Sequence, residues 1–258
     1  MSQVHQRLFG LDGRVALVTG GAGALGLDMA KALQQAGAAI VLLDREQDRL
    51  DQAVAQLTDG DATAIVSDVT DPGAMREAVE RARRWKGRLD ILLNAAGTHV
   101  IRPSHELTLE EWQRVISVNL TGTFVASQAV APVMKEQGGG KIINIGSVMS
   151  TYGMPRRAAY AASKGGVAML TRSLAQEWGP WGICVNAISP GFFRTRLNEH
   201  LFQDPAWVSR LESRVALGRA GRPGDLWGAV IFLASPASDY VNGHVLYVDG
   251  GFTAGEPW

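Results

Sequence analysis

Short apolar runs that alternate with longer amphipathic segments constrain the fold of this chain more than any other feature of its sequence. Residues 15–18, 91–93 and 142–143 are apolar without the period of two that marks a half-exposed strand. Continuous apolar runs are typical of strands buried on both faces of a parallel sheet. The sequence predicts seven such strands, at residues 15–19, 39–43, 62–67, 89–93, 141–145, 182–188 and 244–248.

The segments between these runs have helical apolar spacing, as at residues 25–36, 45–57 and 72–85. A regular alternation of strand and helix favours a doubly wound parallel sheet, with helices on both faces and ligands at the carboxyl ends of the strands. We therefore expect one α/β domain over residues 1–258, since no linker or repeat divides the chain. The long irregular segment 190–218 is expected to contain helical pieces and to form a lid over the substrate.

Composition excludes several classes of function. The chain has 25 basic and 25 acidic residues, and a net charge of zero argues against nucleic acid or an anionic membrane as the partner. The single cysteine, Cys184, and five scattered histidines form no metal-ligand pattern, so no metal site is expected. No apolar run reaches the ~18 residues of a membrane span, and residues 1–14 lack the apolar core of a signal peptide. We expect a cytoplasmic protein.

A glycine-rich turn joins the first predicted strand to the first predicted helix. Gly21, Gly23 and Gly26 fit the spacing G-x-G-x-x-G, and Gly20 precedes them. Backbone amides at such a helix start can face a pyrophosphate, because the helix dipole favours an anion there. A tight turn without a ligand is the alternative. The loop is expected to contact a dinucleotide through Gly20, Gly23, Leu25 and Gly26.

Acidic residues end the second and third predicted strands and bear on the choice of dinucleotide. Asp44 lies 18 residues beyond Gly26, near the spacing at which a carboxylate accepts from the ribose diol of NAD and would repel the 2′-phosphate of NADP. Because Arg45 follows it, NAD is favoured without NADP being ruled out. Asp68, with Val69 beside it, could accept from the adenine amino group, although a strand-end aspartate is also a common turn former.

Tyr160 and Lys164 are four residues apart in a predicted helix, which places both side chains on one face. A neighbouring ammonium favours a phenolate, so Tyr160 could exchange a proton with an alcohol; an ordinary surface pair is the alternative. Ser147 ends the fifth predicted strand, where its hydroxyl could hold a substrate oxygen, and it lacks the G-x-S-x-G frame of a hydrolase nucleophile. These three residues form the candidate catalytic centre.

Together with several others, these motifs resemble those of the short-chain dehydrogenase/reductase family over residues 11–253. The segments that carry the resemblance are Thr19 to Gly26, Asn94 to Gly97, Asn119, Ser147, Tyr160 with Lys164, Pro190 with Gly191, and the closing Asn242-Gly243 and Asp249-Gly250-Gly251. The resemblance implies a Rossmann fold and a nicotinamide cofactor. One departure is Ala24, where the family pattern has glycine, so an extra methyl group stands near the expected pyrophosphate site.

The resemblance also implies a role for each residue. Tyr160 would be the general acid/base, Lys164 would lower its pKa and bind the nicotinamide ribose, and Ser147 would orient the carbonyl group. Asn119 would hold a water molecule in a proton relay. The cofactor-binding residues that it implies beyond the glycine loop and the acidic strand ends are Asn94, Gly97, Tyr160, Lys164, Pro190, Gly191 and Thr195, the last at the carboxamide.

Small residues follow Tyr160 in the same predicted helix. Gly165 and Gly166 each cost about 0.5–1 kcal/mol relative to alanine in a helix, which indicates close packing against another surface. The family commonly forms tetramers through this helix, so a homotetramer is expected. Packing of the glycines within the chain is the alternative.

Within the family, residues 11–19 and 240–251 look most like gluconate 5-dehydrogenase and related sugar-acid or polyol dehydrogenases. The expected pocket edge suits a polar small molecule, with Arg102 or Arg196 as a carboxylate clamp: His99, Arg102, Met149, Tyr152, Met154, Phe193 and Arg196. Two alternatives to this oxidoreductase remain. One is a 3-oxoacyl-thioester reductase using NADPH, whose acyl chain an aromatic lid of Phe192, Phe193 and Trp207 could cover. The other is a non-catalytic regulator that senses the dinucleotide.

Overall fold

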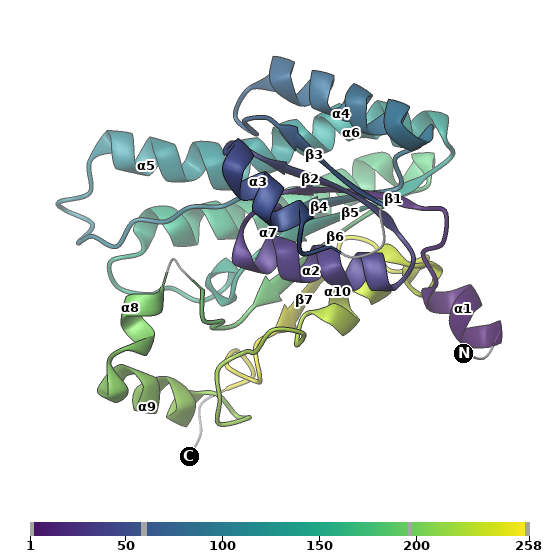
Figure 1. Cartoon of the computed structure of the whole chain (residues 1–258). Coiled ribbons are helices and arrows are strands. Elements are labelled where there is room, and N and C mark those ends of the chain that lie inside the picture. The colour runs from purple at the N-terminus through teal and green to yellow at the C-terminus, as the bar shows by residue number, and fades with distance from the viewer. Residues whose placement is uncertain (1–2, 58–60, 196–197, 256–258) are drawn as a thin grey trace.

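Each of the seven predicted apolar runs forms a strand, and the strands make one parallel sheet in the order β3-β2-β1-β4-β5-β6-β7 (Figure 1). The computed structural model describes residues 3–57, 61–195 and 198–255. The strands are β1 (Val15–Thr19), β2 (Ala39–Asp44), β3 (Ala62–Val66), β4 (Ile91–Asn94), β5 (Gly140–Ile145), β6 (Ile183–Pro190) and β7 (Val245–Val248). The predicted strand bounds differ from these by at most two residues.

Helices cover both faces of the sheet, which confirms the predicted doubly wound Rossmann fold. One face carries α2 (Ala24–Gln35), α3 (Gln47–Val54) and α10 (Trp227–Ala234). The other carries α4 (Pro72–Lys86), α6 (Gly122–Glu136) and α7 (Ala158–Trp178), with α5 (Leu109–Ile116) packed on α7 (Figure 1). The short helix α1 (Gln3–Phe9) near the N-terminus is an element that the sequence analysis did not predict.

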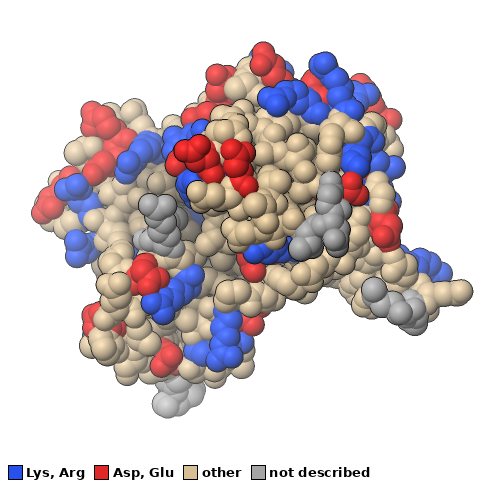
Figure 2. Space-filling view, viewed as in Figure 1, with Lys and Arg blue, Asp and Glu red and all other residues tan. Residues whose placement is uncertain are grey.

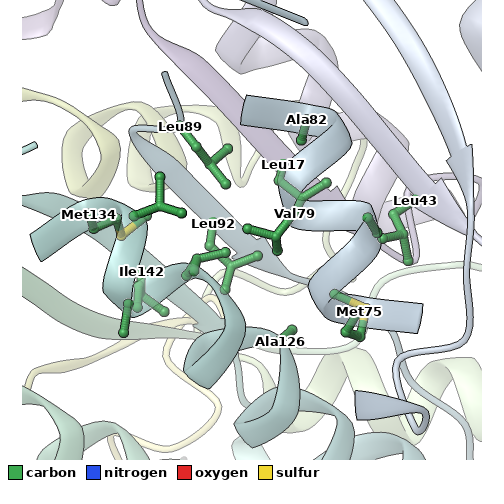
Figure 3. Close-up of a cluster of buried hydrophobic side chains, with 14 of the residues drawn as sticks. Leu17, Leu43, Met75, Val79, Ala82, Leu89, Leu92, Ala126, Met134 and Ile142 are labelled. Carbon is green, nitrogen blue, oxygen red and sulfur yellow. The ribbon is translucent and has the colours of Figure 1, made fainter. Parts of the chain in front are cut away.

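Alternate residues of each central strand enter opposite core clusters. Val15 and Leu17 pack with α4, α6 and α7, whereas Ala16 and Val18 pack with α2 and α10. Figure 3 shows the first cluster, where strand leucines meet side chains of α4 and α6: Leu17, Leu43, Leu92, Met75, Val79 and Met134. Because both faces are covered, neither set of positions can be polar, which explains the continuous apolar runs.

The start and end of α4 follow from local sequence. Asp71 caps the helix, since its carboxylate accepts hydrogen bonds from the amides of Gly73 at 2.7 Å and Ala74 at 3.0 Å. Pro72 occupies the first helical position, where a missing amide hydrogen costs nothing. The helix ends at Gly87, which has a left-handed φ of 77°.

The glycine pair in α7 has two different environments. A Cβ on Gly166 would lie 2.7 Å from Leu120 Cδ2, so this glycine permits close packing within the chain. A Cβ on Gly165 would meet nothing closer than the Ser150 carbonyl oxygen at 3.8 Å. The packing alternative therefore accounts for one of the two glycines.

The segment 190–218 leaves the carboxyl end of β6 and contains α8 (Glu199–Phe202) and α9 (Pro205–Arg214), which project beyond the sheet at the lower left of Figure 1. On the face seen in Figure 2, basic and acidic side chains are interspersed rather than separated by sign. In the part of the chain that the structure describes, no helix is both long and apolar enough to cross a membrane.

Candidate active site

The carboxyl ends of the central strands bring the predicted site residues to one edge of the sheet. β1 ends at Thr19, β4 ends at Asn94, and Ser147 follows the end of β5. The chain crosses over in opposite directions on the two sides of the β1–β4 pair. In a doubly wound sheet, this reversal opens the crevice in which ligands bind.

The glycine turn after β1 lets α2 begin directly against the neighbouring loop. Gly20 has a left-handed φ of 63°, and a Cβ there would lie 2.7 Å from Ala96 Cα. A Cβ on Gly26 would collide with the carbonyl oxygen of Gly20, while the Gly23 amide donates to that oxygen at 2.9 Å. Larger residues at these positions would push the helix away from the turn.

The first turn of α2 presents unused hydrogen-bond donors. Gly23 supplies no side-chain cap, and the amides of Ala24, Leu25 and Gly26 receive no partner from the described residues. Ala24 is exposed, so its methyl group occupies no core space. Free amides at the positive end of a 12-residue helix suit an anion, and this cradle fits the pyrophosphate of a dinucleotide.

Charged groups cluster at the ends of β2 and β3 beside this cradle. The Asp44 carboxylate accepts from the Arg45 amide at 2.8 Å, and Arg45 Nη1 lies 3.8 Å from Asp68 Oδ2. The guanidinium of Arg49 in α3 donates to the carbonyl oxygen of Ala22 at 3.0 Å. Arg49 could not be identified from the sequence, because only the fold brings α3 against the glycine turn.

The amine of Lys164 contacts both the end of β5 and the ring of Tyr160. Lys164 is 5% exposed, and its Nζ donates to the Ile145 carbonyl oxygen at 2.6 Å. The same atom lies 5.7 Å from the centroid of the Tyr160 ring. Burial lowers the pKa of Lys164 from 10.5 to about 8, because the charged form loses its water.

The pKa of Tyr160 is raised above 10.0, contrary to the expectation that its lysine neighbour lowers it. Burial of the hydroxyl is the main cause, and it is opposed by a hydrogen bond from Ser147 and by the positive charge of Arg157. Lys164 is not among the groups that offset this burial, and its own burial makes it lose its charge more easily. Tyr160 is therefore a protonated donor at neutral pH in the protein alone.

Asn119 lies in η1 (Ser117–Thr121), a π-helical turn between α5 and α6. Its side chain is fully buried and makes three hydrogen bonds: it accepts from the Thr98 amide at 2.8 Å and donates to the Thr98 carbonyl at 2.9 Å and to Ser163 Oγ at 3.0 Å. These bonds tie the loop after β4 to α7. The π turn packs against α7, and such local irregularities are frequent at functional sites.

The remaining predicted cofactor residues fall into two groups. Gly97, Pro190 and Gly191 lie at the carboxyl edge, and a Cβ on Gly191 would lie 2.7 Å from Asp249 Cα. Other side chains are already engaged: Asn94 donates to Ser127 at 3.0 Å and to Asn144 at 2.9 Å, Val69 is buried in the core cluster beside α4, and the Thr195 hydroxyl donates to Asn198 at 3.0 Å.

The expected pocket edge is only partly assembled. His99 meets the Tyr160 ring edge-on, with centroids 6.3 Å apart. Arg102 is paired with Glu111, through Nε at 3.1 Å and Nη2 at 2.8 Å, and so is not free as a carboxylate clamp. Arg196, the other candidate clamp, lies outside the described residues. Phe193 is buried in the core cluster that includes α10.

An aromatic cluster joins the segment 190–218 to the turn after Ser147. Phe192 packs edge-on against Trp207, with centroids 5.9 Å apart, and against Phe252 at 5.3 Å. The same cluster contains Met149, Tyr152 and Met154. Among the described residues, no group of three or more His, Cys, Asp or Glu side chains is arranged to hold a metal ion.

Comparison with known proteins shows a relationship over almost the whole chain. Residues 20–253 match the family model described as enoyl-(acyl carrier protein) reductase. Gluconate 5-dehydrogenase of Gluconobacter oxydans (strain 621H) is 41% identical over 251 residues, which are 96% of this chain and 98% of that protein. A 3-oxoacyl-[acyl-carrier-protein] reductase of Thermotoga maritima is 39% identical over 243 residues, 93% of this chain and 98% of that protein.

The fold is also closely similar to that of a solved structure. The crystal structure of a gluconate 5-dehydrogenase from Burkholderia cenocepacia J2315, in complex with NADP and tartrate, matches with a TM-score of 0.92 and 42% sequence identity. The match covers 96% of this chain and 98% of that one.

Proposed function

This chain belongs to the short-chain dehydrogenase/reductase family and is an oxidoreductase that acts on CH–OH groups, and we propose that it oxidises a secondary alcohol of a sugar acid or polyol with NAD. The observation that carries the proposal is the meeting of Ser147, Tyr160 and Lys164 at the sheet edge that also carries the free amides of α2. Hydride donors and proton donors must approach one carbon–oxygen bond together, and this edge brings the two sites side by side.

The proposed proton chemistry uses the chain's own side chains. When bound, a nicotinamide cofactor exchanges a hydride with the substrate carbon. In its deprotonated form Tyr160 takes the alcohol proton during oxidation, and in its protonated form it returns that proton during reduction, while the Ser147 hydroxyl holds the substrate oxygen. Lys164, with its pKa of about 8, is poised to pass a proton near neutral pH and to bind the nicotinamide ribose. Asn119 is assigned the water of the relay that leads away from Lys164.

The proposed cofactor site runs from the glycine turn to the ends of β2 and β3. Gly20, Gly23, Leu25 and Gly26 would hold the pyrophosphate, and Asp44 would accept from the ribose diol. We assign NAD as the preferred cofactor because a carboxylate repels the extra phosphate of NADP. Arg45 and Arg49 lie near enough to accept that phosphate, so NADP is assigned as a weaker alternative, in keeping with relatives crystallised with NADP.

The remaining proposed contacts complete this site. Asp68 and Val69 are assigned to the adenine, Asn94 and Gly97 to the backbone wall beside it, and Pro190, Gly191 and Thr195 to the nicotinamide end. The segment 190–218 is assigned as the substrate lid, since its aromatic side chains pack on the turn that follows Ser147.

The substrate class is inferred from relatives that act on gluconate and its keto form. A 3-oxoacyl thioester remains the second candidate, because the aromatic cluster around Phe192 and Trp207 would also cover an acyl chain.

We further propose a cytoplasmic location, which suits the free thiol of Cys184. We also propose a homotetramer, since Phe124 on α6 and Met169 on α7 are exposed apolar side chains. Light scattering would measure the tetramer mass directly.

A substrate panel tests the proposed function. The purified protein would be assayed with gluconate, other sugar acids, polyols and an acyl thioester, each with both cofactors, by absorbance of the reduced nicotinamide. The proposal expects the highest kcat/KM for a sugar derivative with NAD. Turnover of the acyl thioester alone, with NADPH, would replace the proposed substrate class by the second candidate.

A further inference from the structure

A cavity of about 450 Å³ between the start of α7 and the segment 190–218 has a basic wall, and its volume lies within the range of ~300–1,000 Å³ that small-ligand sites occupy. Arg156, Arg157 and His200 supply the charge, and Phe192 and Trp207 supply an apolar wall. None of the described lining residues is acidic. A positive, partly apolar cavity of this size favours a small organic anion.

Arg157 is the charged group of this wall that lies nearest the reacting centre. It is the N-cap residue of α7, and Tyr160 is three residues further on, so the two side chains leave neighbouring positions of one helical turn. Its positive charge partly offsets the rise in the Tyr160 pKa that burial causes, and it adds to burial in lowering the pKa of His99. His99 in turn meets the Tyr160 ring. Arg157 therefore lines the cavity and also lies within electrostatic range of Tyr160.

The guanidinium of Arg157 is partly buried, and no hydrogen bond or ion pair within the described residues involves its side chain. This contrasts with arginines that have carboxylate partners nearby, such as Arg102 with Glu111 and Arg194 with Glu199. Burial without a partner is costly for a guanidinium, and it lowers the pKa of Arg157. The carboxylate of a bound ligand would supply the ion-pair partner that the guanidinium of Arg157 lacks among the described residues.

The backbone holds Arg157 in place. The residue before it, Arg156, has a left-handed φ of 64°, the only such value at a non-glycine position in the described chain. The Arg156 carbonyl accepts from the Arg102 amide at 3.1 Å, which ties the start of α7 to the loop that carries His99. Unfavourable backbone conformations of this kind persist only where surrounding contacts enforce them, and they are frequent at ligand-binding sites.

We propose that Arg157, aided by His99 and His200, binds the carboxylate of the substrate and so selects sugar acids over neutral polyols. The inference rests on the proposed dehydrogenase function, and it gives Arg157 the role of clamp because Arg102 is already bonded to Glu111. A guanidinium can hold a carboxylate through two parallel hydrogen bonds, which orients the rest of the acid toward Tyr160.

The test compares an acid with its neutral counterpart. Arg157→Met keeps the length of the side chain and removes its charge, and Arg157→Lys keeps the charge without the fork. The kcat/KM ratio of gluconate to sorbitol should fall about 10- to 100-fold in Arg157→Met, with a higher KM for gluconate, and by less in Arg157→Lys. The ratio cancels any effect of Arg157 on the pKa of Tyr160, because that effect acts on both substrates. Arg102→Met is the matched control and should leave the ratio within about twofold.

A binding measurement separates the clamp from turnover. Calorimetry should show that tartrate binds the wild-type protein and that Arg157→Met weakens this binding about tenfold or more, whereas neutral threitol is affected little. An unchanged ratio together with unchanged tartrate binding would overturn the clamp and leave the dehydrogenase intact. A wild-type protein that turns over only acyl thioesters would instead overturn the proposed function, and tartrate binding would then decide on the Arg157 site alone.

Discussion

The ammonium group of Lys164 donates a hydrogen bond of 2.6 Å to the carbonyl oxygen of Ile145. The same amine lies over the Tyr160 ring, 5.7 Å from its centroid, and both side chains leave the same face of α7. Because the amine is also buried, its pKa falls to about 8, so the lysine gives up a proton near neutral pH. Proton transfer to and from this buried amine is central to the proposed chemistry.

The buried Lys164 should cost stability at neutral pH. Below pH 8 it is charged in both the folded and unfolded states, and the burial penalty is complete. Between pH 8 and 10.5 the unfolded chain holds the proton while the folded protein loses it, so stability rises with pH across this window. Lys164→Met should therefore be more stable than wild type at pH 7, by up to about 3 kcal/mol, although inactive.

Urea unfolding at pH 7, 9 and 10.5 measures this difference. The advantage of Lys164→Met should shrink above pH 8 and vanish near pH 10.5. Lys135→Met, which removes an exposed lysine from α6, controls for the loss of one positive charge. A Lys164→Met variant that is less stable than wild type at pH 7 would contradict the burial penalty.

Asp44 should determine the preference between cofactors. Asp44→Ala removes the carboxylate that accepts from the ribose and repels a 2′-phosphate, while Arg45 and Arg49 remain. The ratio of kcat/KM for NAD to that for NADP should fall about tenfold or more, which corresponds to ~1.4 kcal/mol. Asp51→Ala in α3 is the control of equal charge change, and it should leave the ratio near the wild-type value. Higher kcat/KM with NADP in the unmodified enzyme would show that the role given to Asp44 is mistaken.

Asp90 should stabilise the fold without serving the reaction. Burial alone would raise its pKa, but hydrogen bonds from Arg88, the Val15 amide and Arg14 more than compensate and hold the pKa below 3.8. Its contribution is therefore present above pH 3.8 and is lost as the pH falls through the lower folded value. Asp90→Asn should cost about 1–3 kcal/mol at pH 7 and leave kcat unchanged.

Chemical denaturation and steady-state assays on the same preparation test this separation. Asp61→Asn, which breaks the exposed pair with Lys86, should change stability by less than about 1 kcal/mol. A loss of kcat in Asp90→Asn under conditions where the variant is fully folded would place Asp90 in the active site.

The strands and the reactive constellation could be predicted from sequence because both are local signals. A strand buried on both faces must be apolar throughout, and Tyr160 with Lys164 share a helix face by spacing alone. The charge state of this pair could not be predicted. It depends on burial, which raises the pKa of Tyr160 and lowers that of Lys164, and burial follows from contacts distant in sequence.

The arginines also show the difference between what local sequence predicts and what only the fold determines. The sequence does not reveal a partner for the Arg102 guanidinium, because only the fold brings it to Glu111. Glu111 also forms the capping box of α5 with Thr108. Arg157 could have been found from its position three residues before Tyr160, but its lack of a carboxylate partner is a property of the packed structure. Side-chain partners distant in sequence decide which charges remain available for a ligand.

The turnover of Tyr160→Phe tests the central claim most directly. The substitution removes the proton donor and keeps the ring that meets His99. With gluconate and NAD, kcat should fall by about 10²- to 10⁴-fold, while NADH binding, followed by fluorescence, should stay close to wild type. Retention of more than about a tenth of wild-type kcat, with cofactor binding intact, would contradict the assignment of Tyr160 as the general acid/base.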